Sequence, residues 1–297
     1  MGKVILAVDA GGTSIKYRLL SEGDYAFLTE QKFYDMPSMG TKSEILSVFE
    51  NMFADAVRQC EEMGGEIVRA AFSVPGPFDC TAGVSRMEHK WKSLKGIPLR
   101  EAFRKIGILP ETTEYTFLLD VYAFLAGEKY FGHAKNYGNS LAVIIGTGLG
   151  LGLWENGSLR FSEEGGAFYS IFRRPYQEGI LEDYVSGRGL STAYAHVSGQ
   201  SLDAREMADK AREGDRAARE VYRQMGSILG ENIADIIMRH KIQCIVIGGR
   251  VSLAFDLFGQ ALYDTVGGRV RIYASEMLES AAMLGAAVWL GSEPPSK

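Results

Sequence analysis

Short apolar runs alternate with amphipathic stretches along the first third of the chain. The motif TKSE at residues 41–44 matches a capping box, and apolar residues at helical spacing follow it until Gly64-Gly65. The apolar runs on either side have the length of buried strands, and we expect strands at residues 3–8, 15–20, 26–33 and 67–74. This alternation is typical of an α/β fold.

The rest of the chain continues the alternation and becomes mainly helical towards its end. Further strands are expected at residues 116–119, 141–145, 149–154, 158–161 and 243–247. The pair Asn156-Gly157 predicts a tight hairpin between two of them. Apolar residues at helical spacing predict helices at residues 121–131, 215–240, 253–263 and 280–290.

One structural plan occurs twice in the sequence. Residues 4–20 and residues 141–157 each contain an apolar strand, a Gly/Thr turn and a second strand. Such a repeat predicts two related α/β halves, and we expect these halves to face a cleft. Because no linker rich in Pro or Ser separates them, we expect the halves to pack together through a hinge near residue 118.

The composition is that of an ordinary globular protein. Of the 297 residues, 46% are hydrophobic and 23% are charged, and the formal net charge is −5. These values exclude disordered, collagen-like and coiled-coil classes, and they give no electrostatic footprint for nucleic acid. Cys60, Cys80 and Cys244 are too far apart for a disulfide scaffold. Since no apolar run is long enough to span a bilayer, we expect a cytoplasmic protein without nucleic-acid or membrane partners.

The segment DAGGTSIK at residues 9–16 is the first candidate binding site. Gly11 and Gly12 leave backbone N–H groups open to a ligand, Thr13 adds a hydroxyl, and Lys16 adds a positive charge. Asp9, at a strand end, is placed to hold Mg²⁺ through water. The alternative is a plain hairpin whose glycines adopt positive φ.

Two further glycine turns follow buried strands. Gly146, Thr147 and Gly148 repeat the chemistry of the first turn, and two such turns would hold one polyphosphate between them. Gly248 and Gly249 end another strand, where a nucleoside would lie flat against the backbone. The alternatives are a plain hairpin for the first and tight strand–helix packing for the second. Neither is a Walker A loop.

Asp120 is the candidate catalytic residue. It is a lone carboxylate at the end of the strand TFLLD, where a general base would take a proton from a substrate hydroxyl that attacks phosphorus. The alternative is an N-cap for the helix at residues 121–131. The sequence does not separate these two roles.

Taken in order, eight motifs resemble the ROK family of sugar kinases, which belongs to the actin-like ATPase and hexokinase superfamily. The motifs span residues 3–290 and read DAGGTSIK, SVPGPFD, WKSLKGIPL, LLDVYAFLAGE, GTGLGLGLWENG, GILEDYVSGRGL, CIVIGGRVS and AAMLGAA. The resemblance implies a two-lobed actin-like (ribonuclease H-like) α/β fold. It also implies transfer of a phosphoryl group from ATP, with Mg²⁺, to a sugar hydroxyl.

The resemblance also assigns lobes and residue roles. The N-terminal lobe would comprise residues 1–118 plus 280–297, and the larger C-terminal lobe residues 119–279. Asp120 would be the catalytic base, and Glu182 and Gly76 would lie on the sugar side. The residues matching the family's phosphate and adenosine motifs are Asp9, Gly11, Gly12, Thr13, Gly146, Thr147, Gly148, Gly248 and Gly249. Family members are often dimers, but these residues define no interface.

The sequence departs from the family on the acceptor side. Leu119, Tyr122, Phe168 and Ile171 stand where the family usually has two Asn, a Glu and a His. The family's three zinc-binding cysteines are also missing, so we expect no structural zinc. Because a site that loses polar partners disfavours highly polar ligands, we expect a different or modified sugar rather than glucose in the usual pose. His89 is a candidate replacement contact, although a surface loop position explains it as well.

Three hypotheses follow for the function. The first is an ATP-dependent kinase of a sugar or sugar derivative with Asp120 as base. The second is a nucleotide- or sugar-binding sensor with weak or no catalysis and without a DNA-binding domain, because the first phosphate motif begins as early as Asp9. The third is another ATPase of the same superfamily that acts on a carboxylate or an amino sugar.

Overall fold

The computed structural model describes residues 2–88, 90–163 and 165–290. The chain forms two compact units. The first comprises Met1–Gly127, Phe161–Gly166 and Glu279–Lys297, and the second comprises Glu128–Arg160 and Ala167–Leu278. The first unit therefore extends past the expected boundary at residue 118, because it includes the helix that follows Leu119 as far as Gly127.

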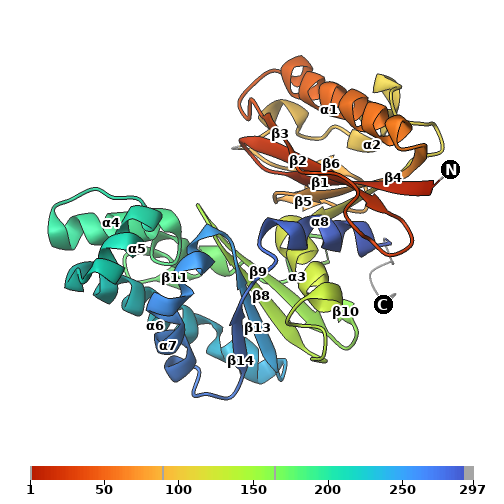
Figure 1. Cartoon of the computed structure of the whole chain (residues 1–297). Coiled ribbons are helices and arrows are strands. Elements are labelled where there is room, and N and C mark those ends of the chain that lie inside the picture. The colour runs from red at the N-terminus through yellow and green to blue at the C-terminus, as the bar shows by residue number, and fades with distance from the viewer. Residues whose placement is uncertain (1, 89, 164, 291–297) are drawn as a thin grey trace. The chain divides into compact units, whose positions relative to one another are not determined.

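The first unit is built on a five-stranded mixed sheet (Figure 1). The sheet has the order β3 (Lys32–Asp35), β2 (Ser14–Ser21), β1 (Gly2–Ala10), β4 (Gly65–Val74) and β7 (Glu114–Leu119). Strand β2 is antiparallel to β1 and β3, whereas β1, β4 and β7 run parallel. A separate short hairpin pairs β5 (Phe78–Asp79) with β6 (Val84–Ser85).

Helices cover both faces of this sheet. Helices α1 (Lys42–Glu62) and α2 (Leu99–Ile106) lie on one face, and α8 (Glu279–Val288) lies on the other (Figure 1). The rings of Phe49, Phe72 and Phe103 pack at centroid distances of 4.8–6.3 Å between the sheet and its helices. The predicted capping box is confirmed, since Thr41 and Glu44 each accept a hydrogen bond from the other's backbone N–H. The short helix η1 (Lys92–Leu94) precedes α2.

The second unit repeats the sheet plan of the first. Its order is β10 (Ser158–Leu159), β9 (Leu149–Glu155), β8 (Ser140–Ile145), β13 (Cys244–Gly248) and β14 (Arg271–Ala274). Again two antiparallel pairings precede two parallel ones. The predicted duplication is therefore confirmed. The Asn156-Gly157 hairpin is confirmed as well, with φ of 54° and 84° at its two turn residues.

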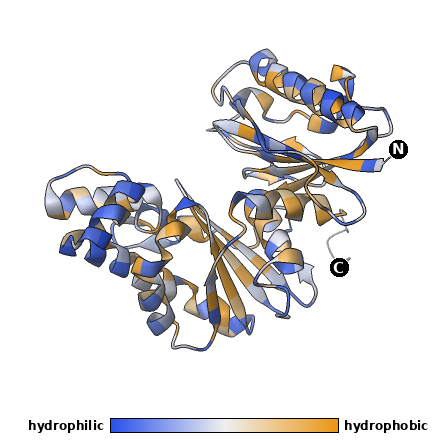
Figure 2. Cartoon of the chain, viewed as in Figure 1, coloured by the Kyte–Doolittle hydropathy of each residue, from blue (hydrophilic) through white to orange (hydrophobic). Residues whose placement is uncertain are grey.

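The helices of the second unit bury its apolar core. Figure 2 shows apolar residues concentrated along the strands and polar residues on the outer helix faces. The longer helices are α3 (Asp120–Phe131), which the two units share, α4 (Gly187–Ser198), α5 (Ala204–Glu213), α6 (Arg216–Arg239) and α7 (Phe255–Thr265). The shorter elements are η2 (Ile171–Arg173), β11 (Pro175–Tyr176), β12 (Gly179–Ile180), η3 (Leu181–Asp183) and η4 (Arg250–Ala254). No helix in the described part of the chain is long and apolar enough to cross a membrane.

The strand expected at residues 26–33 is wrong. Only one isolated bridge, between Leu20 and Phe27, forms there, and β3 begins later, at Lys32. The Thr29 hydroxyl accepts a hydrogen bond from the Leu19 N–H at 3.0 Å, and the Arg18 guanidinium lies 3.6 Å from the Phe27 ring centroid. A side chain therefore takes a backbone donor that a continuous strand ladder would use.

Helices α3 and α8 cross with their backbones in direct contact inside the first unit. A Cβ atom at Gly285 would lie 1.7 Å from the Ala123 carbonyl oxygen, and one at Gly127 would lie 2.0 Å from the Ala281 carbonyl oxygen. Since backbone cannot move aside as a flexible side chain can, packing requires Gly285 in the motif AAMLGAA.

Replacing Gly285 by Ala should therefore destabilise the first unit severely. We expect a loss of about 3 kcal/mol or more, measured as a fall in the thermal midpoint or as failure to fold. The control is Gly23→Ala, because a Cβ at Gly23 would meet only the Ser21 hydroxyl, at 3.8 Å. Equal midpoints for the two variants would contradict the close crossing.

Candidate functional site

The parallel strands of the first unit bring several candidate residues to one edge of the sheet. Strands β1, β4 and β7 run in the same direction, so their carboxyl ends meet there. Asp9 lies at the end of β1, Gly76 follows the end of β4, and Asp120 follows the end of β7. Thr13 is exposed at the tip of the turn that joins β1 to β2. The structure therefore places the first phosphate motif, Gly76 and Asp120 at one edge.

Asp9 is a carboxylate that the surrounding protein largely shields from water. Its Oδ1 accepts a hydrogen bond from the Ser73 hydroxyl at 3.0 Å, across the β1–β4 pairing. Desolvation raises the pKa of Asp9 to about 6, against the opposing effects of Ser73 and Lys16. The nearby carboxylates of Asp120 and Glu279 raise this pKa further. A cation beside Asp9 would relieve that cost.

Asp120 is the first residue of helix α3, and this residue is exposed to solvent. Its Oδ1 accepts a hydrogen bond from the Val121 N–H at 2.7 Å. Desolvation by neighbouring protein raises the pKa of Asp120, while that hydrogen bond and the charge of Lys90 oppose the rise. An N-cap side chain accepts from an N–H two or three residues further along the chain, whereas this contact is with the next residue. The contact therefore does not supply the N-cap role weighed from the sequence.

Lys90 is a residue that the sequence analysis missed. Its side chain lies so close to Gly12 that a Cβ there would be 2.5 Å from the Lys90 Cδ, and its charge acts on Asp120. In the sequence Lys90 follows a lone histidine, His89, and no motif marks Lys90 as a site residue. His89, the predicted substrate contact, lies outside the described residues.

Lys16 lies opposite Asp9 in the β1–β2 pairing, but its ammonium forms an ion pair with Glu279 at 2.5 Å. Glu279 begins helix α8, far away in sequence, and no motif pointed to it. Lys16 therefore lies beside the turn at residues 11–13, and the Glu279 carboxylate partly neutralises its charge.

The second unit gathers the remaining candidates at one edge of its own sheet. Strands β8 and β13 are parallel, so the turn Gly146-Thr147-Gly148 and the pair Gly248-Gly249 follow neighbouring strand ends. Gly249 has φ of 82°, and a Cβ there would lie 2.4 Å from the Ile145 carbonyl oxygen. Tight packing therefore requires this glycine, as one alternative proposed. Helix α4 begins beside the turn, where the Gly187 N–H donates to the Gly146 carbonyl at 2.7 Å.

Glu182 contacts the turn Gly146-Thr147-Gly148 and the residue that follows it. Its Oε2 accepts a hydrogen bond from the Leu149 N–H at 2.9 Å, and its Oε1 lies 3.3 Å from the Arg188 guanidinium. A Cβ at Gly148 would lie 2.7 Å from the Glu182 Oε2. Gly148 therefore makes room for this carboxylate.

Positive φ does not explain the glycines of the two phosphate turns. Among the described glycines with positive φ, Gly11, Gly12, Gly146 and Gly148 do not occur. Gly146 is the clearest case, because no described atom beyond its chain neighbours lies within 4 Å of a Cβ built there. The open space beside Gly146 leaves room for a ligand to approach the backbone closely.

The four apolar replacements on the acceptor side contact other parts of their own units. Leu119 and Tyr122 are buried in the first unit, where the Tyr122 ring meets the Phe161 ring at 4.8 Å. In the second unit Ile171 is buried, and Phe168 packs edge-on against His240 at a centroid distance of 6.0 Å. These side chains therefore contribute to packing within their own units.

Within the described residues, no three or more His, Cys, Asp or Glu side chains are grouped to hold a metal ion. Asp9 by itself fits Mg²⁺ that arrives with a nucleotide, because phosphate oxygens and water then supply the other ligands.

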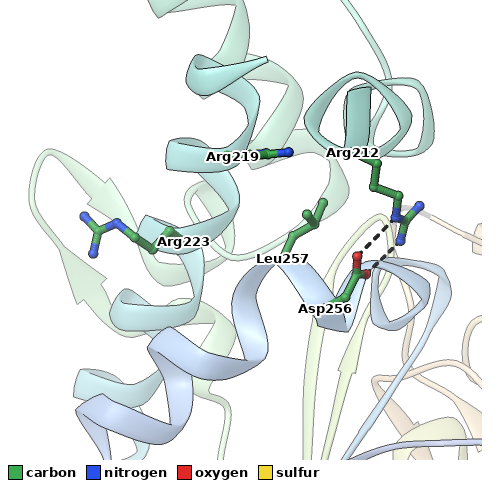
Figure 3. A pocket seen from close by; sticks show the side chains of 5 residues that line it. All are labelled: Arg212, Arg219, Arg223, Asp256 and Leu257. Carbon is green, nitrogen blue, oxygen red and sulfur yellow. Dashed lines mark hydrogen bonds and ion pairs between the residues drawn. The ribbon is translucent and has the colours of Figure 1, made fainter. Parts of the chain in front are cut away.

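A hollow of about 470 Å³ between α5, α6 and α7 is basic, but its arginines have structural partners (Figure 3). Arg212 forms a two-pronged contact with Asp256, and Arg219 donates to the Ala211 carbonyl at the end of α5. Arg223 extends away from Asp256 and pairs with Glu220. Because each arginine already has a partner within the protein, this hollow gives no specific indication of a ligand.

The repeated sheets with their glycine turns define a duplicated α/β fold of the actin-like ATPase class. The chain belongs to the ROK family, because the model of that family matches residues 5–293. Glucokinase from Thermotoga maritima is 26% identical over 95% of this chain and 96% of its own length.

Solved structures share the fold. A ROK family glucokinase from Streptomyces griseus, in complex with glucose and AMPPNP, has a TM-score of 0.76 at 21% identity, over 96% of this chain and 98% of its own. A ROK family transcriptional regulator, a homologue of the E. coli MLC protein, has a TM-score of 0.83 at 20% identity, over 97% of this chain and 77% of its own.

The raised pKa of Asp9 predicts that Asp9→Asn stabilises the protein above pH 6. The folded pKa of about 6 exceeds the ordinary value of 3.8, so the folded state favours the neutral carboxyl. The contribution of the neutral Asp9 carboxyl to the free energy of unfolding is fully present below about pH 3.8 and is lost as the pH rises through 6. Thermal unfolding should show a gain on the order of 1 to 3 kcal/mol at pH 8, shrinking towards pH 4. A gain that grows on acidification would contradict the assignment.

Proposed function

We propose that the protein is an ATP-dependent kinase that phosphorylates a hydroxyl of a sugar or sugar derivative. Its glycine turns bind the phosphates of ATP, Gly248 and Gly249 contact the nucleoside, and Asp120 is the general base. Membership of the ROK family and the kinase relatives support this activity.

One observation carries the proposal. In each unit an exposed threonine, Thr13 or Thr147, stands next to glycine without positive φ. Each of these turns follows a central strand, β1 or β8, that pairs in parallel with its neighbour in the sheet. Backbone N–H groups and a hydroxyl at such a turn are suitable donors for phosphate oxygens. Packing alone gives Gly146 no reason to be glycine.

The chemical step needs an accessible base next to a phosphate site. The ionised Asp120 takes the proton of the acceptor hydroxyl while its oxygen forms a bond to the γ-phosphorus of ATP. The bond between that phosphorus and the oxygen bridging to the β-phosphate breaks, and ADP leaves. Lys90, whose charge acts on Asp120, favours the ionised form of the base.

Mg²⁺ bound with ATP would neutralise phosphate charge, and Asp9 would hold it. Asp9 fits this role because its carboxylate is desolvated and has one hydroxyl partner, Ser73, among the described side chains. Lys16 adds positive charge beside the same turn when a phosphate competes with Glu279 for it.

The acceptor is a sugar that presents fewer hydroxyls to the site than glucose does, or a modified one. Leu119 and Ile171 offer buried, packed side chains where polar partners would be needed. Leaving a substrate hydroxyl unpaired costs binding energy. Gly76 and Glu182 remain as proposed acceptor contacts.

Replacing Gly146 by Ala tests the phosphate turn without disturbing the fold. A Cβ there has no neighbour within 4 Å, so we expect the thermal midpoint to stay unchanged. Binding of MgAMPPNP, measured by calorimetry, should weaken by about tenfold or more, because the methyl group blocks the approach of phosphate to the backbone. Gly23→Ala is the control, with unchanged binding. Unchanged nucleotide affinity in Gly146→Ala would argue against this turn as a phosphate site.

Replacing Asp120 by Asn tests the base. A screen of ATP consumption over hexoses, N-acetyl amino sugars and polyols should identify the acceptor, and the variant should lose about 10²- to 10⁴-fold in kcat. Binding of MgAMPPNP should persist, because Asn keeps the shape and the Val121 contact. Acceptor-stimulated turnover that survives the substitution would exclude Asp120 as the base.

A binding protein without catalysis is the second candidate. The likeness to a ROK transcriptional regulator and the apolar acceptor side favour it. Binding of MgATP together with no turnover on any acceptor of the screen would support this candidate against the kinase.

A further inference from the structure

The chain between β10 and α4 contains a stretch with little regular structure. We call residues 167–183 the bracing segment. It holds only two short 3-10 helices, η2 and η3, and a hairpin of two-residue strands, β11 and β12. A stretch with so few backbone pairings depends on side-chain contacts for its position.

One end of the bracing segment is held by a chain of three side chains. The Tyr169 hydroxyl lies 2.7 Å from His240 Nε2, and His240 Nδ1 lies 2.8 Å from Glu155 Oε1. His240 is 9% exposed, and the Phe168 ring packs edge-on against it. If Nδ1 carries the proton towards the carboxylate, Nε2 accepts from the tyrosine, so Glu155 orients the imidazole.

Arg174 provides a second attachment of the same segment. It donates to the Asn232 carbonyl oxygen in α6 and contacts the Asp235 carboxylate at 3.1 Å. Both attachments therefore join the bracing segment to the C-terminal half of α6 or the residue that ends it, His240.

The other end of the bracing segment carries Glu182. This residue accepts the hydrogen bond from Leu149 and occupies the space beside Gly148. Displacement of the segment would therefore displace the carboxylate that supports the second phosphate turn and that we propose as an acceptor contact.

We propose that Tyr169, His240 and Glu155 are positioning residues that hold the bracing segment, and Glu182 with it, against the turn at Gly148. They act on substrate binding through Glu182 and do not touch the reacting atoms. The consequence for acceptor binding rests on the proposed kinase function, whereas the consequence for the segment itself does not.

Tyr169→Phe tests the proposal because it removes one hydroxyl and keeps the ring. Tyr176→Phe is the matched control in the same segment: the Tyr176 ring packs against Tyr184 at 5.0 Å, and among the described residues its hydroxyl has no hydrogen-bond partner. Hydrogen exchange of amides in residues 167–183 should accelerate about 3- to 10-fold in Tyr169→Phe and stay unchanged in the control.

Kinetics then separate positioning from simple loss of stability. For an acceptor that the wild-type enzyme phosphorylates, Tyr169→Phe should raise the acceptor KM about 3- to 10-fold and leave kcat within about twofold. The reason is that part of the binding free energy is then used to order the bracing segment. Tyr176→Phe should change neither constant.

Two outcomes overturn the proposal. Exchange equal to that of the control shows that Tyr169 does not hold the segment, and faster exchange without a change in acceptor KM shows that the segment does not position Glu182 for binding. If the wild-type enzyme phosphorylates no acceptor, the kinase function fails and the positioning of Glu182 for an acceptor fails with it. The exchange measurement still decides by itself whether Tyr169 holds the segment.

Discussion

Both units depend on the same constraint, the parallel pairing of central strands whose carboxyl ends meet at one edge. In the first unit the pairing of β1 with β4 sets the Ser73 hydroxyl 3.0 Å from Asp9. In the second, the pairing of β8 with β13 presses Gly249 against the Ile145 carbonyl. In the proposed function, each turn would bind its ligand at the end of a strand that this pairing holds in place.

The charged groups of the first unit form a connected set around that edge. Asp9 is shielded from water, Lys16 is engaged by Glu279, and Lys90 acts on Asp120. A carboxylate with a raised pKa next to a shared lysine is suited to receiving a cation and an anion together, as a metal-bound nucleotide supplies them. Such a set is costly for stability, which is common where residues are arranged for chemistry.

In the second unit, packing and hydrogen bonds within the protein hold the stretch that leads to Glu182. Phe168 and Ile171, which stand where the resemblance implied polar acceptor residues, are both packed. The chain of Tyr169, His240 and Glu155, together with Arg174, holds the same stretch by hydrogen bonds within the protein.

The sequence by itself determined the duplicated plan, the capping box at Thr41 and the hairpin at Asn156-Gly157, because period, caps and turn residues are local signals. It also pointed to the glycine turns and to Asp120. Only the tertiary structure decided that residues 26–31 form no continuous strand, and that Lys90 and Glu279 join the site. It likewise decided that Glu182 lies against Gly148. Those contacts join residues far apart in the chain, and no local pattern encodes a distance that packing alone sets.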